Sequence, residues 1–155
     1  MRELWLLRHA EALPAGHGSD LERALNAHGQ AQAQAVGRQL SALRLVPDSV
    51  LCSPARRTRE TAQAVIDALP APPSITFLDG IYDASAGELL ALATQHGAGE
   101  HVLLVGHNPG LTYLAMALCP QAPGFRGMAT ATLARIALEG PAEPGHGRLL
   151  AIYTS

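Results

Sequence analysis

The sequence predicts an α/β protein in which helices cover both faces of a mainly parallel sheet, giving a three-layer α/β/α arrangement. Short apolar runs alternate with helix-forming runs along the chain, which is typical of this class. The apolar run at residues 4–7 is continuous, as expected for a strand buried on both faces. A length of 155 residues suits one domain with a full core, so we expect residues 1–155 to form a single domain.

The first half of the chain contains three expected strands and two expected helices. These are a strand at 4–7, a helix at about 26–43, a strand at 50–52, a helix ending near 69, and a strand at 75–78. Asn26 is the expected N-cap of the first helix, in which Gly29 and Gly37 lower the helix propensity. Ser53 is the expected N-cap of the second helix, with Pro54 at its first position.

The second half continues the alternation and ends in two strands. The expected elements are a helix at 86–96, a strand at 101–105, a helix at about 111–118, and strands within 130–138 and 148–154. A loop rich in glycine and proline at 140–147 separates the last two strands. This loop predicts that they pair with each other as a hairpin.

The composition argues against several classes of function. All 11 basic residues are arginines, so neither a Schiff-base lysine nor a P-loop lysine is available. The net charge of −2 gives no reason to expect a nucleic acid partner. No apolar run approaches the roughly 20 residues of a membrane-spanning helix, and the first run is too short for a signal peptide. Cys52 and Cys119 form neither a disulfide framework nor a CxxC metal site, so we expect a cytoplasmic protein without a membrane partner.

Polar side chains follow three of the expected strands. Arg8 and His9 follow the first strand, Ser53 and an arginine cluster follow the second, and His107 follows the fourth. Because ligands of such sheets bind beyond the carboxyl ends of the strands, we expect these groups to meet. Arg57 lies about one turn into a helix whose positive N-terminus faces the same edge, a setting that suits phosphate oxygens. The pattern predicts an anion pocket in which one imidazole attacks the bound group.

Each of these residues, taken alone, also has a simpler interpretation. A lone histidine at a strand end usually makes a local hydrogen bond, and Arg56 and Arg59 are expected to be solvated charges on the helix surface. Two histidines could bind zinc, but the sequence offers no third ligand at a recognisable spacing, and nearby arginines would repel a cation. We therefore expect no metal and no other cofactor.

Four short motifs occur in a fixed order along the chain. They are Arg8-His9, DxxRxL…G at 20–29, SPxxRxxxT at 53–61 and Gly106-His107. In this combination the chain, from residue 4 to about 138, resembles the histidine phosphatase superfamily. Its small size and the stretch "RHAEA … DLERALNAHGQAQA" are similar to the SixA-type branch, the phosphohistidine phosphatases. The resemblance implies a phosphoglycerate mutase-like fold.

The resemblance also implies a hydrolase that uses no metal and forms a phosphohistidine intermediate. His9 would be the nucleophile, while Arg8, Arg57 and His107 would hold the phosphoryl oxygens. The implied substrate is phosphohistidine in a protein. Further candidate substrate contacts are Arg23, Ser53, Asp79 and Asp83.

The proton donor of the larger superfamily members has no clear counterpart. Those members use a glutamate after the third strand, and the matching position here is Gly80, with Asp79 and Asp83 nearby. Without such an acid, an alkyl phosphomonoester is disfavoured because its alkoxide leaving group needs a proton. Phosphohistidine tolerates the loss better, since imidazole leaves more easily. The alternatives are a small-molecule phosphomonoesterase that uses one of these aspartates, and a phosphate- or phosphopeptide-binding module without turnover.

Overall fold

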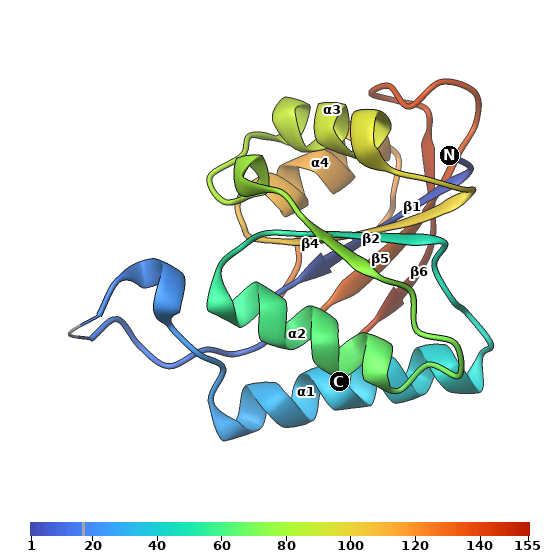
Figure 1. Ribbon diagram of the computed structural model, residues 1–155. Helices are drawn as coiled ribbons and strands as arrows, with labels where there is room; N and C mark the ends of the chain where they lie inside the picture. Colours follow the sequence, from blue (N-terminus) through green and yellow to red (C-terminus); the bar gives the residue numbers. More distant parts are fainter. Residues whose placement is uncertain (17) are drawn as a thin grey trace.

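A six-stranded sheet lies at the centre of the computed structural model, which describes residues 1–16 and 18–155 (Figure 1). The strands are β1 (Glu3–Arg8), β2 (Ser49–Cys52), β3 (Ile75–Phe77), β4 (His101–Gly106), β5 (Leu133–Leu138) and β6 (Gly147–Tyr153). Their order is β3-β2-β4-β1-β5-β6; the first four are parallel, whereas β5 runs antiparallel to β1 and to β6. The mainly parallel sheet and the C-terminal hairpin are therefore confirmed.

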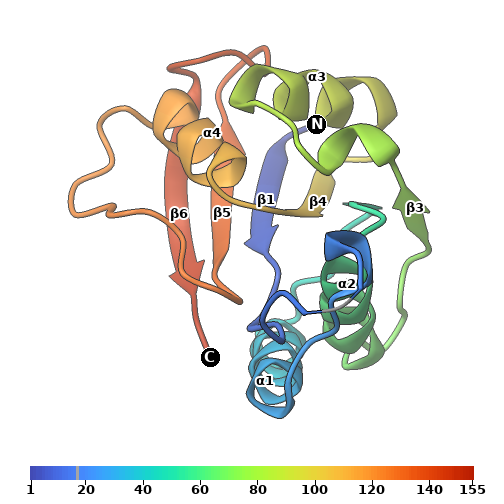
Figure 2. The ribbon, with the colours of Figure 1, turned by 90° about the vertical axis from the view of Figure 1, so that its left-hand side faces the viewer.

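Helices cover both faces of this sheet (Figures 1 and 2). They are α1 (Ala27–Ala42), α2 (Arg56–Asp67), α3 (Ala86–His96) and α4 (Gly110–Leu118), with short 3-10 helices η1 (Asp20–Glu22) and η2 (Asp79–Ile81) that the sequence did not predict. Helices α1 and α2 pack on one face, and α3 and α4 pack on the other. This confirms the three-layer α/β/α arrangement. Within the described ranges, no helix is long and apolar enough to cross a membrane.

The central strand β1 contributes to the core on both sides of the sheet. Leu4 and Leu6 pack in the cluster beneath α3 and α4, whereas Trp5 and Leu7 pack in the cluster beneath α1 and α2. All four side chains are at most 1% exposed. Because burial of each such side chain contributes about 1.5–3 kcal/mol, β1 is firmly held by both helical layers. The residues at its carboxyl end are thereby held in place as well.

The pairing of β1 with β4 brings two polar motifs together. Arg8 pairs with Gly106 at the last position of each strand. The backbone N–H of His9 then donates to the carbonyl oxygen of Gly106 at 3.1 Å. His9 and His107 therefore leave the sheet at the same edge, as expected for parallel neighbours.

The start of α2 differs from the prediction. The helix begins at Arg56 with Ala55 at the N-cap position, so Ser53 is not its N-cap and Pro54 is not its first residue. The Ser53 hydroxyl instead accepts a hydrogen bond from the Ala55 N–H at 3.3 Å and lies 2.8 Å from His107 Nε2. The second contact spans 54 residues of sequence, which is why local capping rules missed it.

Helix α1 begins where predicted, and its glycines explain how closely it packs. The Asn26 side chain accepts a hydrogen bond from the Gly29 N–H at 2.7 Å and caps the helix. A Cβ atom on Gly29 would lie 2.0 Å from the Glu11 carbonyl oxygen, and one on Gly37 would lie 2.7 Å from the Val65 carbonyl oxygen. These glycines lower helix propensity, but they allow α1 to contact the loop after β1 and the backbone of α2.

Candidate active site

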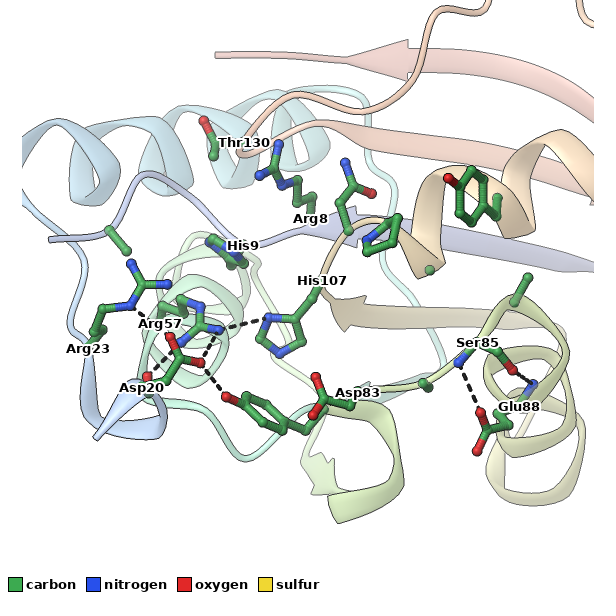
Figure 3. Close-up of a pocket in the computed structure, with 18 of the residues that line it drawn as sticks. Arg8, His9, Asp20, Arg23, Arg57, Asp83, Ser85, Glu88, His107 and Thr130 are labelled. Carbon is green, nitrogen blue, oxygen red and sulfur yellow. Dashed lines mark hydrogen bonds and ion pairs between the residues drawn. The ribbon is translucent and has the colours of Figure 1, made fainter. Parts of the chain in front are cut away.

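A pocket of about 760 Å³ opens at the carboxyl edge of the sheet, beside the N-terminal ends of α3 and α4 (Figure 3). Arg8 and His9 enter it from the end of β1, and His107 enters from the end of β4. Arg57 enters from the first turn of α2. The structure therefore places these four residues, which the sequence singled out, around one cavity.

The ring of His9 is held in one orientation by its own neighbour. Its Nδ1 lies 2.7 Å from the carbonyl oxygen of Ala10. A carbonyl can only accept, so Nδ1 carries the proton and Nε2 keeps a free lone pair. The next backbone N–H, that of Ala10, donates to Thr61 Oγ1 at 2.9 Å and fixes the turn to α2. His9 is thus an oriented imidazole with one reactive nitrogen.

His9 is also uncharged at neutral pH. The pKa of His9 is lowered to about 4, with burial as the largest cause; the hydrogen bond to Ala10 opposes this shift, and the positive charges of Arg57 and Arg8 add to it. The ordinary pKa of histidine is 6.5. The protein therefore keeps this imidazole in its nucleophilic, unprotonated form.

His107 lies beside His9, with the two ring centroids 5.4 Å apart. Its Nδ1 is 3.4 Å from an Arg57 nitrogen, and its Nε2 is 2.8 Å from Ser53 Oγ. Because a guanidinium can only donate, Nδ1 accepts and Nε2 donates its proton to Ser53. Burial lowers the pKa of His107 to about 3, with the Arg57 charge as the second cause, so this ring is neutral as well.

Arg57 is the most buried cation of the pocket and is held by Asp20 of η1. Its Nη1 donates to the Asp20 carbonyl oxygen at 2.8 Å, and its Nη2 donates to Asp20 Oδ2 at 2.9 Å. Asp20 also accepts hydrogen bonds from Arg23 Nε at 3.0 Å and from the Tyr82 hydroxyl. The Tyr82 hydrogen bond, followed by those of the two arginines, keeps the pKa of Asp20 well below its usual range. One carboxylate thus orients two guanidinium groups, as Figure 3 shows.

Arg8 and Arg57 each have one buried nitrogen without a hydrogen-bond partner among the described residues. Arg8 Nη1 donates to the carbonyl oxygen of Met128 at 3.1 Å. The Nε atoms of Arg8 and Arg57 are buried without a hydrogen-bond partner among the described residues. Both guanidinium groups nevertheless line the cavity, and a guanidinium group suits an anion such as a phosphoryl group.

The remaining sequence candidates divide into pocket and non-pocket residues. Arg23 and Asp83 line the cavity, whereas Ser53 and Asp79 are not among the described residues that form its wall. Ser53 is fully buried and contacts the His107 ring from behind. A Cβ on Gly80 would lie 3.2 Å from Leu92 of α3, so that position faces the helix.

Several pocket residues had not been recognised as site residues from the sequence, among them Asp20, Tyr82 and Asn108. Asp20 lines the cavity and belongs to the DxxRxL motif, in which no role had been predicted for it. Tyr82 stacks edge-on against His107, with ring centroids 5.4 Å apart. Asn108 directly follows His107 and also lines the cavity. No local pattern marks Tyr82, because only the folding of η2 brings it to the pocket. Nowhere in residues 1–16 and 18–155 do three His, Cys, Asp or Glu side chains gather as a metal site would require.

An oriented neutral imidazole beside buried guanidinium groups, at the carboxyl edge of an α/β sheet, defines a site for phosphoryl chemistry. The sequence profile of the histidine phosphatase superfamily (branch 1) matches residues 4–101. The chain therefore belongs to the histidine phosphatase superfamily. An uncharacterised protein of Picosynechococcus is 31% identical over 119 residues, which cover 75% of this chain and 72% of the relative.

Solved structures place the chain more narrowly. SixA of Agrobacterium tumefaciens, described as a candidate phosphohistidine phosphatase, has a TM-score of 0.83 at 30% identity and covers 99% of both chains. The protein histidine phosphatase SixA complexed with tungstate has a TM-score of 0.80 at 25% identity, covering 98% of this chain and 96% of that one. Within the superfamily the chain is thus of the SixA type, and its fold is phosphoglycerate mutase-like, as the motifs implied.

Proposed function

We propose that the protein is a metal-independent phosphohistidine phosphatase in which residues 1–155 form one catalytic domain and His9 is the nucleophile. Membership of the histidine phosphatase superfamily and the SixA-type fold support phosphatase activity. The observation that carries the assignment of His9 is its hydrogen bond to Ala10, which leaves Nε2 unprotonated toward the pocket. Simple phosphate binding does not require a nucleophile oriented in this way.

In the first step, His9 Nε2 attacks the phosphorus atom in line with the leaving group. The new N–P bond forms as the bond to the leaving imidazole breaks, and the bonding electron pair departs with that imidazole. The His9 ring gains positive charge, which the Ala10 carbonyl oxygen stabilises through the Nδ1–H. Arg8 and Arg57 hold the phosphoryl oxygens and offset the charge that develops on them. Arg23 lies at the pocket wall, and we assign it a contact with the substrate.

In the second step, water attacks the phosphorus of phosphorylated His9. The N–P bond breaks, its electron pair returns to Nε2, and the proton lost by water passes to solvent. Free phosphate and neutral His9 result. A lowered pKa suits this step, because His9 is released directly in the form that begins the next cycle.

The leaving group decides the proposed substrate class. Imidazole can be protonated on its distal nitrogen before the reaction, so it departs as a neutral molecule without an enzymic acid. The leaving group of an alkyl phosphate departs as an alkoxide unless an enzymic acid protonates it. The loss of such a general acid typically costs roughly 10²–10⁴-fold in rate. The position that matches the donor of larger relatives is Gly80, which faces Leu92 rather than the cavity. This favours phosphohistidine in a protein over an alkyl phosphate.

One observation supports a second candidate, a small-molecule phosphomonoesterase. Asp83 lines the cavity and is the only one of the two candidate acids to do so among the described residues. If Asp83 protonates a leaving oxygen, phosphomonoesters would be hydrolysed efficiently.

The test is a comparison of three substrates in the presence of EDTA. These are a phosphohistidine peptide, a matched peptide with phosphoserine in place of the phosphohistidine, and p-nitrophenyl phosphate. We expect kcat/KM to favour phosphohistidine over phosphoserine by at least about a hundredfold. Asp83→Asn should leave phosphohistidine hydrolysis nearly unchanged, as should the control Asp79→Asn. Efficient phosphoserine hydrolysis that collapses only in Asp83→Asn would instead establish the phosphomonoesterase.

A further inference from the structure

A closed ring of hydrogen bonds joins the start of α4 to the loop before β5. The Asn108 side-chain oxygen accepts from the Thr112 N–H at 3.1 Å and from Thr112 Oγ1 at 2.9 Å. Thr112 Oγ1 accepts from the Met128 N–H at 3.1 Å. The ring closes where Asn108 Nδ2 donates to the Met128 carbonyl oxygen at 2.8 Å. Each polar atom of the Asn108 amide therefore has a defined partner.

The same Met128 carbonyl oxygen is the partner of the Arg8 side chain. Arg8 Nη1 donates to it at 3.1 Å, so this oxygen accepts hydrogen bonds from both Arg8 and Asn108. The backbone of Arg8 is held separately: its N–H donates to Thr132, and its carbonyl oxygen accepts from Ala131, each at 3.1 Å. Loss of the ring would therefore loosen the Met128 carbonyl that holds the Arg8 side chain and leave the Arg8 backbone in register.

We propose that Asn108 is a positioning residue that holds the Arg8 guanidinium in place through the Met128 carbonyl. The proposal rests on the proposed function, in which Arg8 binds phosphoryl oxygens. A long arginine side chain loses up to about 2 kcal/mol of rotamer entropy when it is ordered. If the protein orders that side chain before the substrate arrives, this cost does not weaken binding or raise the barrier. Asn108 supplies this order without touching Arg8 itself.

An asparagine fits this position better than its acidic counterpart. Its oxygen meets two donors from Thr112, and its nitrogen meets an acceptor, the Met128 carbonyl. An aspartate would keep the first contacts but would place a second acceptor against that carbonyl. It would also add a negative charge to a pocket that must bind an anion.

The test is a double-mutant cycle between Asn108→Ala and Arg8→Ala. Tungstate, which a solved SixA relative binds, serves as the probe, and its dissociation constant is measured by calorimetry. We expect Asn108→Ala to weaken tungstate binding by about five- to twentyfold in the wild-type background. In the Arg8→Ala background the same change should weaken it by less than about twofold, since the contact it supports is gone.

Two variants of the ring partner complete the experiment. Thr112→Val removes the hydroxyl link and should weaken tungstate binding in the same direction, whereas Thr112→Ser keeps the hydroxyl and should bind like the wild type. These variants also provide the test if Asn108→Ala does not fold. Equal losses for Asn108→Ala, or for Thr112→Val, in both backgrounds would overturn the proposal, because the ring would then act independently of Arg8.

Calorimetry with tungstate does not depend on the substrate class. A protein that fails to hydrolyse phosphohistidine, but shows the expected coupling, would contradict the proposed function and support the inference about Asn108. A protein that hydrolyses phosphohistidine but shows additive losses would support the function and contradict the inference.

Discussion

The hydrogen bond from His9 Nδ1 to the Ala10 carbonyl oxygen selects the nitrogen that can react. At 2.7 Å it assigns the proton to Nδ1, and a pKa of about 4 leaves Nε2 unprotonated at neutral pH. Neither property is visible in the motif Arg8-His9 itself. The first arises from the hydrogen bond to Ala10, and the second arises from burial of the ring beside the positive charges of Arg57 and Arg8.

The three arginines at the start of α2 provide a test of the site at the scale of one residue. The Arg57 side chain is 6% exposed and lines the pocket, whereas that of Arg59 is 44% exposed and pairs with Glu22 at 3.7 Å. Arg57→Ala should cost about 2–4 kcal/mol of transition-state stabilisation, as for a preorganised donor to a developing anion. Arg59→Ala should change kcat/KM by little, because exposed ion pairs contribute little. Both variants are assayed with phosphohistidine peptide, and equal losses would show that Arg57 has no special role.

At the scale of elements, the packing of α1 against the loop after β1 depends on one glycine. A Cβ on Gly29 would lie only 2.0 Å from the Glu11 carbonyl oxygen. That loop follows His9 directly, so α1 supports the backbone that presents the nucleophile. Gly87 in α3 is a matched counterpart, since a Cβ there meets nothing within 4 Å.

The two glycines should therefore respond oppositely to alanine. Gly87→Ala should raise the free energy of unfolding by up to about 1 kcal/mol, the usual gain from replacing a helical glycine. Gly29→Ala should lower it by about 2 kcal/mol or more, because the backbone must move to relieve the clash. Urea denaturation measures both. A Gly29→Ala variant as stable as Gly87→Ala would show that α1 does not pack so closely on this loop.

The elements also show where sequence reasoning was sufficient and where it failed. Strand β1 was predicted from its run of apolar residues, and helix α1 was predicted from its Asn26 cap. Each of these signals lies within its own element or directly beside it. The 3-10 helices η1 and η2 were not, although they bring Asp20 and Tyr82 to the pocket. Each is three residues long, too short for periodicity to indicate, and each is held by contacts with distant parts of the chain.

At the scale of the whole molecule, the neutral histidines make stability depend on pH. In the unfolded chain their pKa is near 6.5, whereas in the native protein it is about 4 for His9 and about 3 for His107. Between these values the unfolded state binds protons that the native state does not. The contribution of both rings is therefore complete above pH 6.5 and is lost as the pH falls, toward 4 for His9 and toward 3 for His107.

This dependence can be measured by urea denaturation between about pH 7.5 and pH 5, above the range in which most carboxylates titrate. The free energy of unfolding should fall below pH 6.5, by at most about 1.4 kcal/mol per pH unit for each ring. A His9→Gln variant, which lacks one of these groups, should show a shallower fall. A flat profile in the wild type, or the same slope in both proteins, would mean that the histidines titrate normally.

The site as a whole was predictable to the extent that its residues follow strands of a parallel sheet. His9, His107, Arg8 and Arg57 were placed from strand ends and motifs, and the register of β1 with β4 brings the two histidines to one edge. The support of these residues was not predictable. Ser53 behind His107 and Asn108 beside Met128 act through contacts across 54 and 20 residues.

The central prediction for this protein is that His9 Nε2 carries the phosphoryl group during turnover. The most direct measurement mixes enzyme and phosphohistidine peptide, quenches the reaction in alkali, in which an N–P bond survives, and locates the phosphoryl group by mass spectrometry. We expect it on the peptide that contains His9, and we expect none in a folded His9→Ala variant that has lost turnover. A phosphoryl group on another residue would contradict the account. So would a His9→Ala protein that retains more than about a hundredth of the wild-type kcat/KM.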